Sequence, residues 1–331
     1  MSSYPPHRRP SRSTLYIVCT MIALALPVIG TGRAQAKAYK GAEVYSKNSV
    51  LYGRMEIRMR MIRGSGMLST FFTYKDGSEL SGELWEELDI EALGKNDAEG
   101  WQSNLITGNP RVTSEKVHTP GGSLADDYHT YQIEWTPEYV SWSFDGVEVR
   151  RTEGGQVSEL TNEHTLRFNV WASESTGWAG NFDEDALPAY QFVNWIRYYR
   201  YEDGRFSLDW TDDFETFDTS RWSKGTWTFD GNRVDFATAN AVVQDGTLIL
   251  AITKEDATGF SGSVPVDPQG DANDAPIPPS EPTTPTAPAG SSSSSGCSLA
   301  PSRPSHRGAA ALAGLCLLMF ASARLVSRRR R

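Results

Sequence analysis

The chain has 331 residues, of which 39% are hydrophobic and 22% are charged, and its formal net charge is −9 at pH 7. Eleven of the 32 basic residues lie within residues 1–36 or 297–331, where no residue is acidic. The part between them therefore carries 21 basic against 41 acidic residues, a net charge of −20. A nucleic-acid partner is disfavoured, because phosphate binding needs a basic face.

The first 36 residues have the layout of a secretory signal peptide. Arginines within residues 8–12 precede an apolar run, Leu15–Ile29, and the tripeptide Ala34–Ala36 has small residues at both key positions. A first transmembrane helix is the alternative, but Pro27 interrupts the run and about 20 apolar residues are needed to span a bilayer. We therefore expect export and cleavage after Ala36.

Residues 37–260 are expected to form one all-β domain. Apolar and polar residues alternate over 53–60, 130–135 and 140–144, which is the period of a half-buried strand. Asp-Gly pairs such as Asp145-Gly146 punctuate the chain, and glycine readily takes the positive φ of a turn. All three cysteines lie in the terminal segments, so a packed core must stabilise this domain without disulfides. Many short strands with frequent turns predict a β-sandwich.

Acidic residues alternate within the segment 85–94. Alternation places Glu87, Asp89 and Glu91 on one face of a strand and apolar residues on the other. Like charges on one face repel, so a fold tends to accept them where water or a function compensates. The outer α-carbons should lie about 13 Å apart, and inward-leaning glutamates can approach the about 5 to 5.5 Å of a retaining glycosidase. A solvated acidic strand is the simpler interpretation, because this short pattern alone is weak evidence.

The surrounding residues resemble the active-site strand of family 16 glycoside hydrolases, specifically of lichenases, which cut mixed-linkage β-1,3-1,4-glucans. The E-x-D-x-E spacing of residues 87–91 is the lichenase form, whereas many laminarinases have one more residue before the final Glu. The resemblance continues through 128–137, 167–171 and 194–198, and it covers nearly all of residues 39–254. It implies a concanavalin-like jelly roll with a concave cleft for a β-glucan polysaccharide.

The resemblance also implies a role for each site residue. Glu87 would be the nucleophile, Glu91 the general acid and then base, and Asp89 the partner that tunes and orients them. An ionised Glu87 would disfavour ionisation of Glu91, which then keeps its proton for the leaving oxygen. Aromatic rings would stack on sugar faces and polar side chains would hydrogen-bond sugars. The expected substrate-binding residues are Phe72, Tyr74, Trp85, Gln102, Asn104, Arg167, Asn169, Trp171, Trp178 and Trp227.

No cofactor is expected for the chemistry, but a structural calcium is implied by the resemblance. Family members often bind it on the opposite side of the sandwich, and the matching positions are Asn194, Asp213 and Gly246. Oxygen ligands suit calcium, although an uncharged Asn binds it less strongly than an Asp would. Trp195 lies between apolar neighbours and is assigned to the core.

The order of segments departs from the family's usual order. Residues 206–254 look like the amino-terminal part of an ordinary lichenase, yet they follow the part that contains Trp195. The sequence therefore looks circularly permuted. Sandwich termini often lie close together, so the old ends can be joined through residues 201–205 without loss of packing. We expect the strand over residues 247–252 to pack in the same sandwich as the strand containing Glu87.

The C-terminal part divides into a linker and a tail. Residues 261–296 are rich in Pro, Ser, Thr and Asp, which predicts a linker. The tail, residues 297–331, contains Cys297, an apolar stretch over 308–326 and a final arginine cluster. That stretch is about 28 Å long as a helix, enough to cross a membrane with the arginines in the cytoplasm.

The tail resembles the MYXO-CTERM type of sorting tail, in which Cys297 would be the modified residue and a sorting protease would be a partner. A plain membrane anchor is the alternative. The expected location is the cell surface or the medium, with outer-membrane attachment after tail processing.

Two other functions also stay open. A non-catalytic glycan-binding module would be expected to lack one of the two glutamates, and a transglycosylase would pass the glycosyl intermediate to another sugar.

Overall fold

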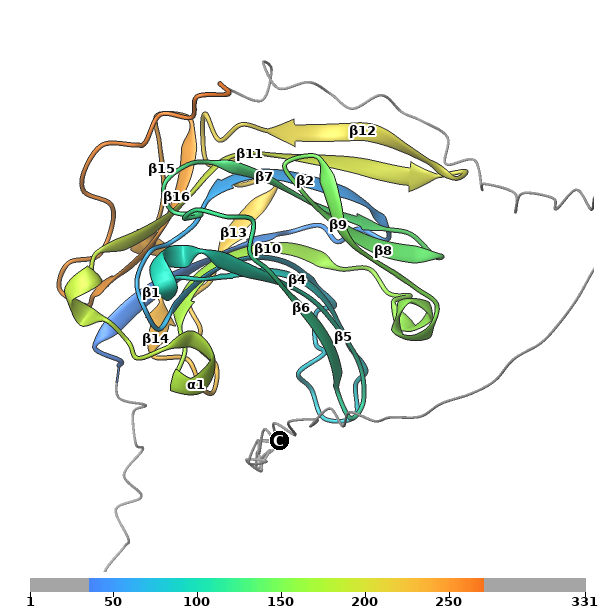
Figure 1. Cartoon of the computed structure of the whole chain (residues 1–331), viewed down its shortest axis with the longest axis horizontal. Helices are drawn as coiled ribbons and strands as arrows, with labels where there is room; N and C mark the ends of the chain where they lie inside the picture. The colour runs from blue at the N-terminus through green and yellow to red at the C-terminus, as the bar shows by residue number, and fades with distance from the viewer. Residues whose placement is uncertain (1–35, 271–331) are drawn as a thin grey trace, which may run out of the picture. The chain divides into compact units, whose positions relative to one another are not determined.

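Two layers, antiparallel except for the pairing of one short strand, make up the part of the chain that the computed structural model describes, residues 36–270 (Figure 1). The layer that we call concave contains, in spatial order, β6 (Val112–His118), β5 (Gly100–Gly108), β4 (Trp85–Leu93), β3 (Met67–Tyr74), β10 (Thr165–Ala172) and β1 (Tyr39–Ser46). The convex layer contains β16 (Thr247–Lys254), β11 (Ala189–Glu202), β2 (Gly53–Arg60), β7 (His129–Trp135), β8 (Tyr139–Phe144) and β9 (Val147–Glu153).

Shorter elements complete the two layers. β12 (Arg205–Asp212) pairs with β11, β15 (Ala241–Gln244) with β16, and both β13 (Trp222–Lys224) and β14 (Val234–Phe236) with β1. The helical elements in residues 36–270 are single turns: α1 (Thr176–Ala179), η1 (Asn96–Ala98), η2 (Gly155–Glu159), η3 (Glu184–Ala186) and η4 (Thr238–Asn240). The prediction of an all-β jelly roll is confirmed.

Apolar side chains of both layers meet in one core, as the alternation predicts. Leu88 and Ile90 on β4 and Ile57 on β2 are fully buried in it. Burial of such side chains stabilises the fold by about 1.5 to 3 kcal/mol each. Trp195 is 2% exposed, which confirms its assignment to the core.

The core face of β4 also carries a carboxylate. Glu86 is 0% exposed, and its Oε2 accepts hydrogen bonds from the backbone N–H groups of Thr161 at 2.9 Å and Asn162 at 3.1 Å. Nε2 of the buried His164 lies 3.4 Å away, and its Nδ1 lies 2.8 Å from Oγ1 of Thr73. Burial alone would raise the pKa of Glu86, but these hydrogen bonds lower it. The network ties β4 to the loop before β10.

The C-terminal strand β16 belongs to the same sandwich as β4. It pairs with β11 from Ala189↔Ile252 to Val193↔Leu248, and it also pairs with the start of β1. The expectation that residues 247–252 and the strand of Glu87 share one sandwich is therefore confirmed.

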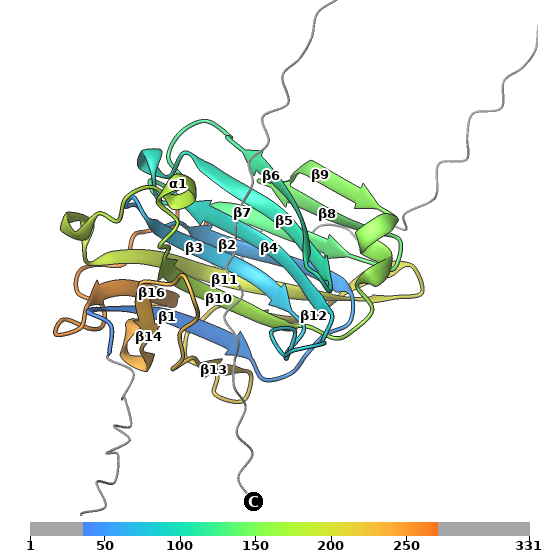
Figure 2. The same ribbon diagram turned by 90° about the horizontal axis from the view of Figure 1, so that it is seen from below.

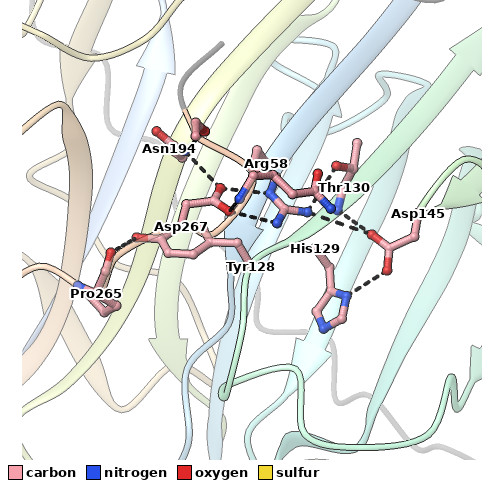
Figure 3. Close-up of polar contacts among 10 residues, drawn as sticks. Arg58, Tyr128, His129, Thr130, Asp145, Asn194, Pro265 and Asp267 are labelled. Carbon is pink, nitrogen blue, oxygen red and sulfur yellow. Dashed lines mark hydrogen bonds and ion pairs between the residues drawn. The ribbon is translucent and has the colours of Figure 1, made fainter. Parts of the chain in front are cut away.

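The packed part of the chain extends past Phe260 into residues whose composition predicted a linker. Figure 3 shows Asp267 against β2, where Arg58 donates two hydrogen bonds of 2.8 Å to its carboxylate. The Arg58 side chain is 2% exposed and that of Asp267 is 5% exposed. Asn194 Nδ2 adds a third hydrogen bond of 2.9 Å, and the Tyr128 hydroxyl donates to the Pro265 carbonyl. We call residues 261–270 the strap.

Replacing Asp267 by asparagine should lower the free energy of unfolding by about 3 kcal/mol, because it leaves the Arg58 cation buried with its bidentate partner gone. Burial raises the pKa of Asp267, but the bonds from Arg58 and Asn194 outweigh it and lower the pKa. This stabilisation is therefore present above the unfolded pKa of about 3.9 and is lost as pH falls through the folded value.

Urea denaturation at neutral and acid pH measures both effects, with the exposed Asp256→Asn as the matched control. The difference in the free energy of unfolding between the wild type and Asp267→Asn should disappear at acid pH. Equal stability of the two variants at neutral pH would mean that the strap adds nothing.

The predicted signal peptide and tail lie outside the described residues, apart from Ala36. Within residues 36–270, no helix is long and apolar enough to cross a membrane.

Candidate active site

Glu87, Asp89 and Glu91 alternate along β4 with Leu88 and Ile90, which are buried in the core, so the three acids lie on the opposite face of the strand. Figure 2 shows the concave layer from below, with β3 next to β4 and then β10 and β1. Against β3, Glu87 lies opposite Tyr74, Asp89 opposite Phe72 and Glu91 opposite Thr70. Acidic and apolar residues alternate along β4 because every second side chain of a strand points into the core.

The register across the concave layer aligns the predicted residues in two rows. Residues directly opposite each other on neighbouring strands share a face, so a row crosses the sheet perpendicular to the strands. The first row contains Tyr45, Arg167, Phe72, Asp89 and Asn104. The second row contains Glu43, Asn169, Thr70, Glu91 and Gln102.

The other predicted aromatic residues surround these rows. Trp178 on α1 donates from Nε1 to Oε1 of Gln102 at 2.9 Å, and its ring lies 5.8 Å from that of Trp171. Trp227, between β13 and β14, lies 5.2 Å from the ring of Tyr45. Tyr74 and Trp85 lie 5.5 Å apart beside Glu87. All ten residues expected to bind substrate therefore lie on the concave layer or on segments in contact with it.

The environment of each acid differs. Burial raises the pKa of Glu91 to about 8, and the charges of Glu87 and Glu115 act in the same direction. Burial, followed by the charges of Glu87 and Glu91, raises the pKa of Asp89 well above its usual value. Oδ2 of Asp89 is buried without a hydrogen-bond partner within the described residues, which fits a neutral carboxyl group.

Glu87 has the partners that favour a negative charge. Burial raises its pKa, but a hydrogen bond from Asp89, one from Trp85 and the charges of Arg111 and Arg167 oppose that rise. The Trp85 Nε1 donates to Oε2 of Glu87 at 2.5 Å. Burial outweighs these partners, so the pKa of Glu87 stays above its usual value. The pKa of Glu91 is raised to about 8, so at neutral pH Glu91 keeps its proton beside a Glu87 whose partners favour its anion.

The structure adds a carboxylate that the sequence analysis missed. Glu43 on β1 is 3% exposed and accepts hydrogen bonds from Nη1 of Arg167 at 2.8 Å and from Nδ2 of Asn169 at 3.2 Å. Burial raises the pKa of Glu43, and the charge of Arg167 opposes this. The alternation of Glu43 and Tyr45 with apolar residues was visible in the sequence, but nothing there showed that only β3 and β10 separate β1 from β4.

The expected calcium ligands lie on the far layer. Asn194 is the bulged residue of β11, since the register against β2 shifts between Val193 and Trp195. A methyl group added at Gly246 would lie 3.9 Å from the carbonyl oxygen of Asp213, so these two backbones are close. The amide nitrogen of Asn194 instead donates to Asp267 and to the Gly270 carbonyl.

Residues 36–270 contain no cluster of three or more His, Cys, Asp or Glu side chains that could hold a metal. The calcium site stays a prediction.

Comparisons with known proteins identify the family. The sequence profile of Glycosyl hydrolases family 16 matches residues 22–211. A β-glucanase of Fibrobacter succinogenes is 51% identical over 246 residues, which are 72% of this chain and 70% of that protein. A β-glucanase of Bacillus subtilis is 34% identical over 148 residues, 44% of this chain and 58% of that protein.

Among solved structures, a β-glucanase of Bacillus licheniformis matches 48% of this chain and 71% of its own, with 30% identity and a TM-score of 0.43. The profile covers more than half of the chain, and the Fibrobacter protein is similar over more than two thirds of its own length. The chain belongs to family 16 of the glycosyl hydrolases.

Proposed function

We propose that the protein is an endo-acting, retaining β-glucanase that hydrolyses mixed-linkage β-1,3-1,4-glucan. The observation that carries the proposal is the set of three carboxyls on one face of β4 in unlike electrostatic environments. Glu91 is held protonated near neutral pH, while Glu87 is supplied with two hydrogen-bond donors and two arginines. A retaining glycosidase needs this pair of an acid and an ionised nucleophile.

In the proposed mechanism, Glu87 attacks the anomeric carbon while Glu91 gives its proton to the leaving glycosidic oxygen. A covalent glycosyl-enzyme forms, and Glu91, now ionised, takes a proton from the water that displaces Glu87. Asp89 keeps its proton between them and donates to Glu87, which orients the nucleophile. Family 16 glucanases need no cofactor for catalysis.

The substrate class is supported by the site's composition. The aromatic side chains at 72, 74, 171, 178 and 227 offer apolar faces to sugar rings, and the cleft amides offer hydrogen bonds to uncharged hydroxyls. The two glutamates in the E-x-D-x-E form favour mixed-linkage glucan over laminarin, and a hydrolase over a glycan-binding module. The proteins most relevant here, from Fibrobacter and Bacillus, are named β-glucanases.

Barley β-glucan, lichenan, laminarin, carboxymethylcellulose and agarose should be compared as substrates. Cleavage of the first two alone is the expected result, and proton magnetic resonance should show the β-anomer first. Preferential cleavage of laminarin would replace the mixed-linkage assignment. Predominant transfer products would indicate a transglycosylase, and binding without cleavage would indicate a glycan-binding module.

The pH dependence of kcat/KM should have an alkaline limb near pH 8, because Glu91 must be protonated and its pKa is raised to about 8. The charge of Glu115 contributes to this rise. Glu115→Gln should therefore move the alkaline limb to lower pH, while Glu148→Gln, an exposed acid on the convex layer, should not. A limb that stays in place in Glu115→Gln would contradict the assignment of Glu91 as the acid.

We further propose that the chain is circularly permuted and that it is exported and carries a sorting tail. The permutation is supported by the pairing of β16 with β11 and β1, and by the 246-residue match to the Fibrobacter protein, against 148 residues for that of Bacillus subtilis. Mass spectrometry of the mature protein tests export: Lys37 should be the first residue, and a retained Met1 would contradict cleavage.

A further inference from the structure

Arg111 lies in the short loop between β5 and β6. It is one of the two arginines whose charge acts on Glu87, but the resemblance gave it no role. Its guanidinium carbon lies 4.3 Å from the centroid of the Trp85 ring. Within residues 36–270 it makes no ion pair and no hydrogen bond, so this indole is its one close partner. A guanidinium over an indole face is attracted by the ring quadrupole.

The β5–β6 hairpin explains why Arg111 reaches this position. Trp85, the first residue of β4, lies opposite Gly108, the last residue of β5. Pairing of β5 with β6 resumes at Thr107↔Val112, so residues 108–111 form the turn at this end of the sheet. The turn returns the chain over the start of β4, which brings the arginine to the indole.

Trp85 connects Arg111 to the proposed nucleophile. Its Nε1 donates to Oε2 of Glu87, while its ring meets Tyr74 edge-on. One face of the indole carries Arg111, so Trp85 is fixed by contacts on several sides. The indole N–H can hold the Glu87 carboxylate in one orientation only while the ring itself is held.

We propose that Arg111 is a positioning residue: its guanidinium holds the Trp85 indole, and the indole N–H holds the Glu87 carboxylate in the orientation needed for attack. This inference rests on the proposed function, because it assigns a purpose to the orientation of Glu87.

The charge of Arg111 gives the proposal a second, measurable consequence. Burial raises the pKa of Glu87, and Arg111 is among the groups that lower it. Without this cation Glu87 should take up its proton at higher pH, so the acid limb of kcat/KM should move upward. The other titratable and charged groups that act on Glu87 or belong to its surroundings are Asp89, Glu91, Glu43, Arg167, Tyr74 and Glu115.

The test is kcat/KM of the full protein on barley β-glucan across pH, for Arg111→Gln and Arg111→Lys. Arg111→Gln removes the charge and should lower kcat/KM by on the order of tenfold, mostly through kcat, since misplaced reacting groups slow the chemical step. Its acid limb should move to higher pH. Arg111→Lys keeps the charge, so its acid limb should stay near that of the wild type while part of the loss in kcat remains.

Arg221→Gln is the control for loss of a guanidinium over an indole. Arg221 lies 4.0 Å from the Trp210 ring and also pairs with Asp212 and Asp218. Arg221 and Trp210 line a pocket that contains none of the three acids of β4. Loss of Arg221 should leave both kcat and the acid limb unchanged.

An Arg111→Gln variant with wild-type kcat and an unmoved acid limb would overturn the proposal. So would a change confined to KM, which would make Arg111 a sugar contact. Failure of the proposed function is distinguishable, because the wild type itself would then not cleave the glucan.

Discussion

Alanine in place of Glu87 should lower kcat/KM on barley β-glucan by at least about 10³-fold, because the covalent step loses its nucleophile. Glu91→Ala should cause a similar loss on this substrate, whose leaving oxygen needs a proton. Glu83→Ala is the matched control: it removes an exposed glutamate just before β4, and its activity should match that of the wild type.

Added azide distinguishes the two roles. In Glu87→Ala, azide can enter the vacated space and attack from that face while Glu91 protonates the leaving oxygen, so the product is an α-glycosyl azide. In Glu91→Ala, an activated aryl glycoside still forms the intermediate with Glu87, and azide then displaces Glu87 to give a β-glycosyl azide. Magnetic resonance of the products identifies the anomer.

The opposite pairing of products would mean that nucleophile and acid are exchanged. Full activity in both variants, or α-products formed first by the wild type, would remove the retaining mechanism altogether and favour a binding module.

Arg167→Met should lower the free energy of unfolding by about 3 to 5 kcal/mol, because it leaves the carboxylate of Glu43 buried without its charged partner. Arg167 also donates to Asp76 at 2.7 Å, and its guanidinium lies 5.0 Å from the Tyr74 ring. The same variant should bind glucan more weakly, since Arg167 helps to hold the cleft's aromatic side chains.

A double-mutant cycle isolates the buried pair. Glu43→Gln in the Arg167→Met background should recover part of the lost stability, because the uncompensated charge is removed. Arg200→Met is the control, since the pair of Arg200 with Asp209 has side chains 48% and 32% exposed and such pairs contribute about 0 to 1 kcal/mol. Denaturant unfolding measures each variant. Strictly additive losses would show that Glu43 and Arg167 do not interact energetically.

The local pattern of β4 could be read from the sequence because a strand alternates with period two. Once Leu88 and Ile90 were assigned to the core, Glu87, Asp89 and Glu91 had to share the other face. Phe72, Arg167 and the amide residues at 102, 104 and 169 could be named through resemblance, and the register places them in the same two rows.

Other features were decided by contacts between distant segments. Glu86 stands in the same acidic run as Glu87, yet it faces the core and is satisfied by residues more than 70 positions away. Glu43 lies in the same row as Glu91 because β1 pairs with β10, and Asp267 packs on β2 although its segment has the composition of a linker.

The sequence by itself thus determined the all-β class, the face of the acids and the family, since all three follow from periodicity and local motifs. Only the tertiary structure showed which groups raise the pKa of Glu91 and which groups oppose the rise in the pKa of Glu87. These pKa values depend on burial and on charges contributed by β1, β6, β10 and the loop of Arg111. The Coulomb energy of two charges depends on the distance between them in space and on their surroundings, not on their separation along the chain.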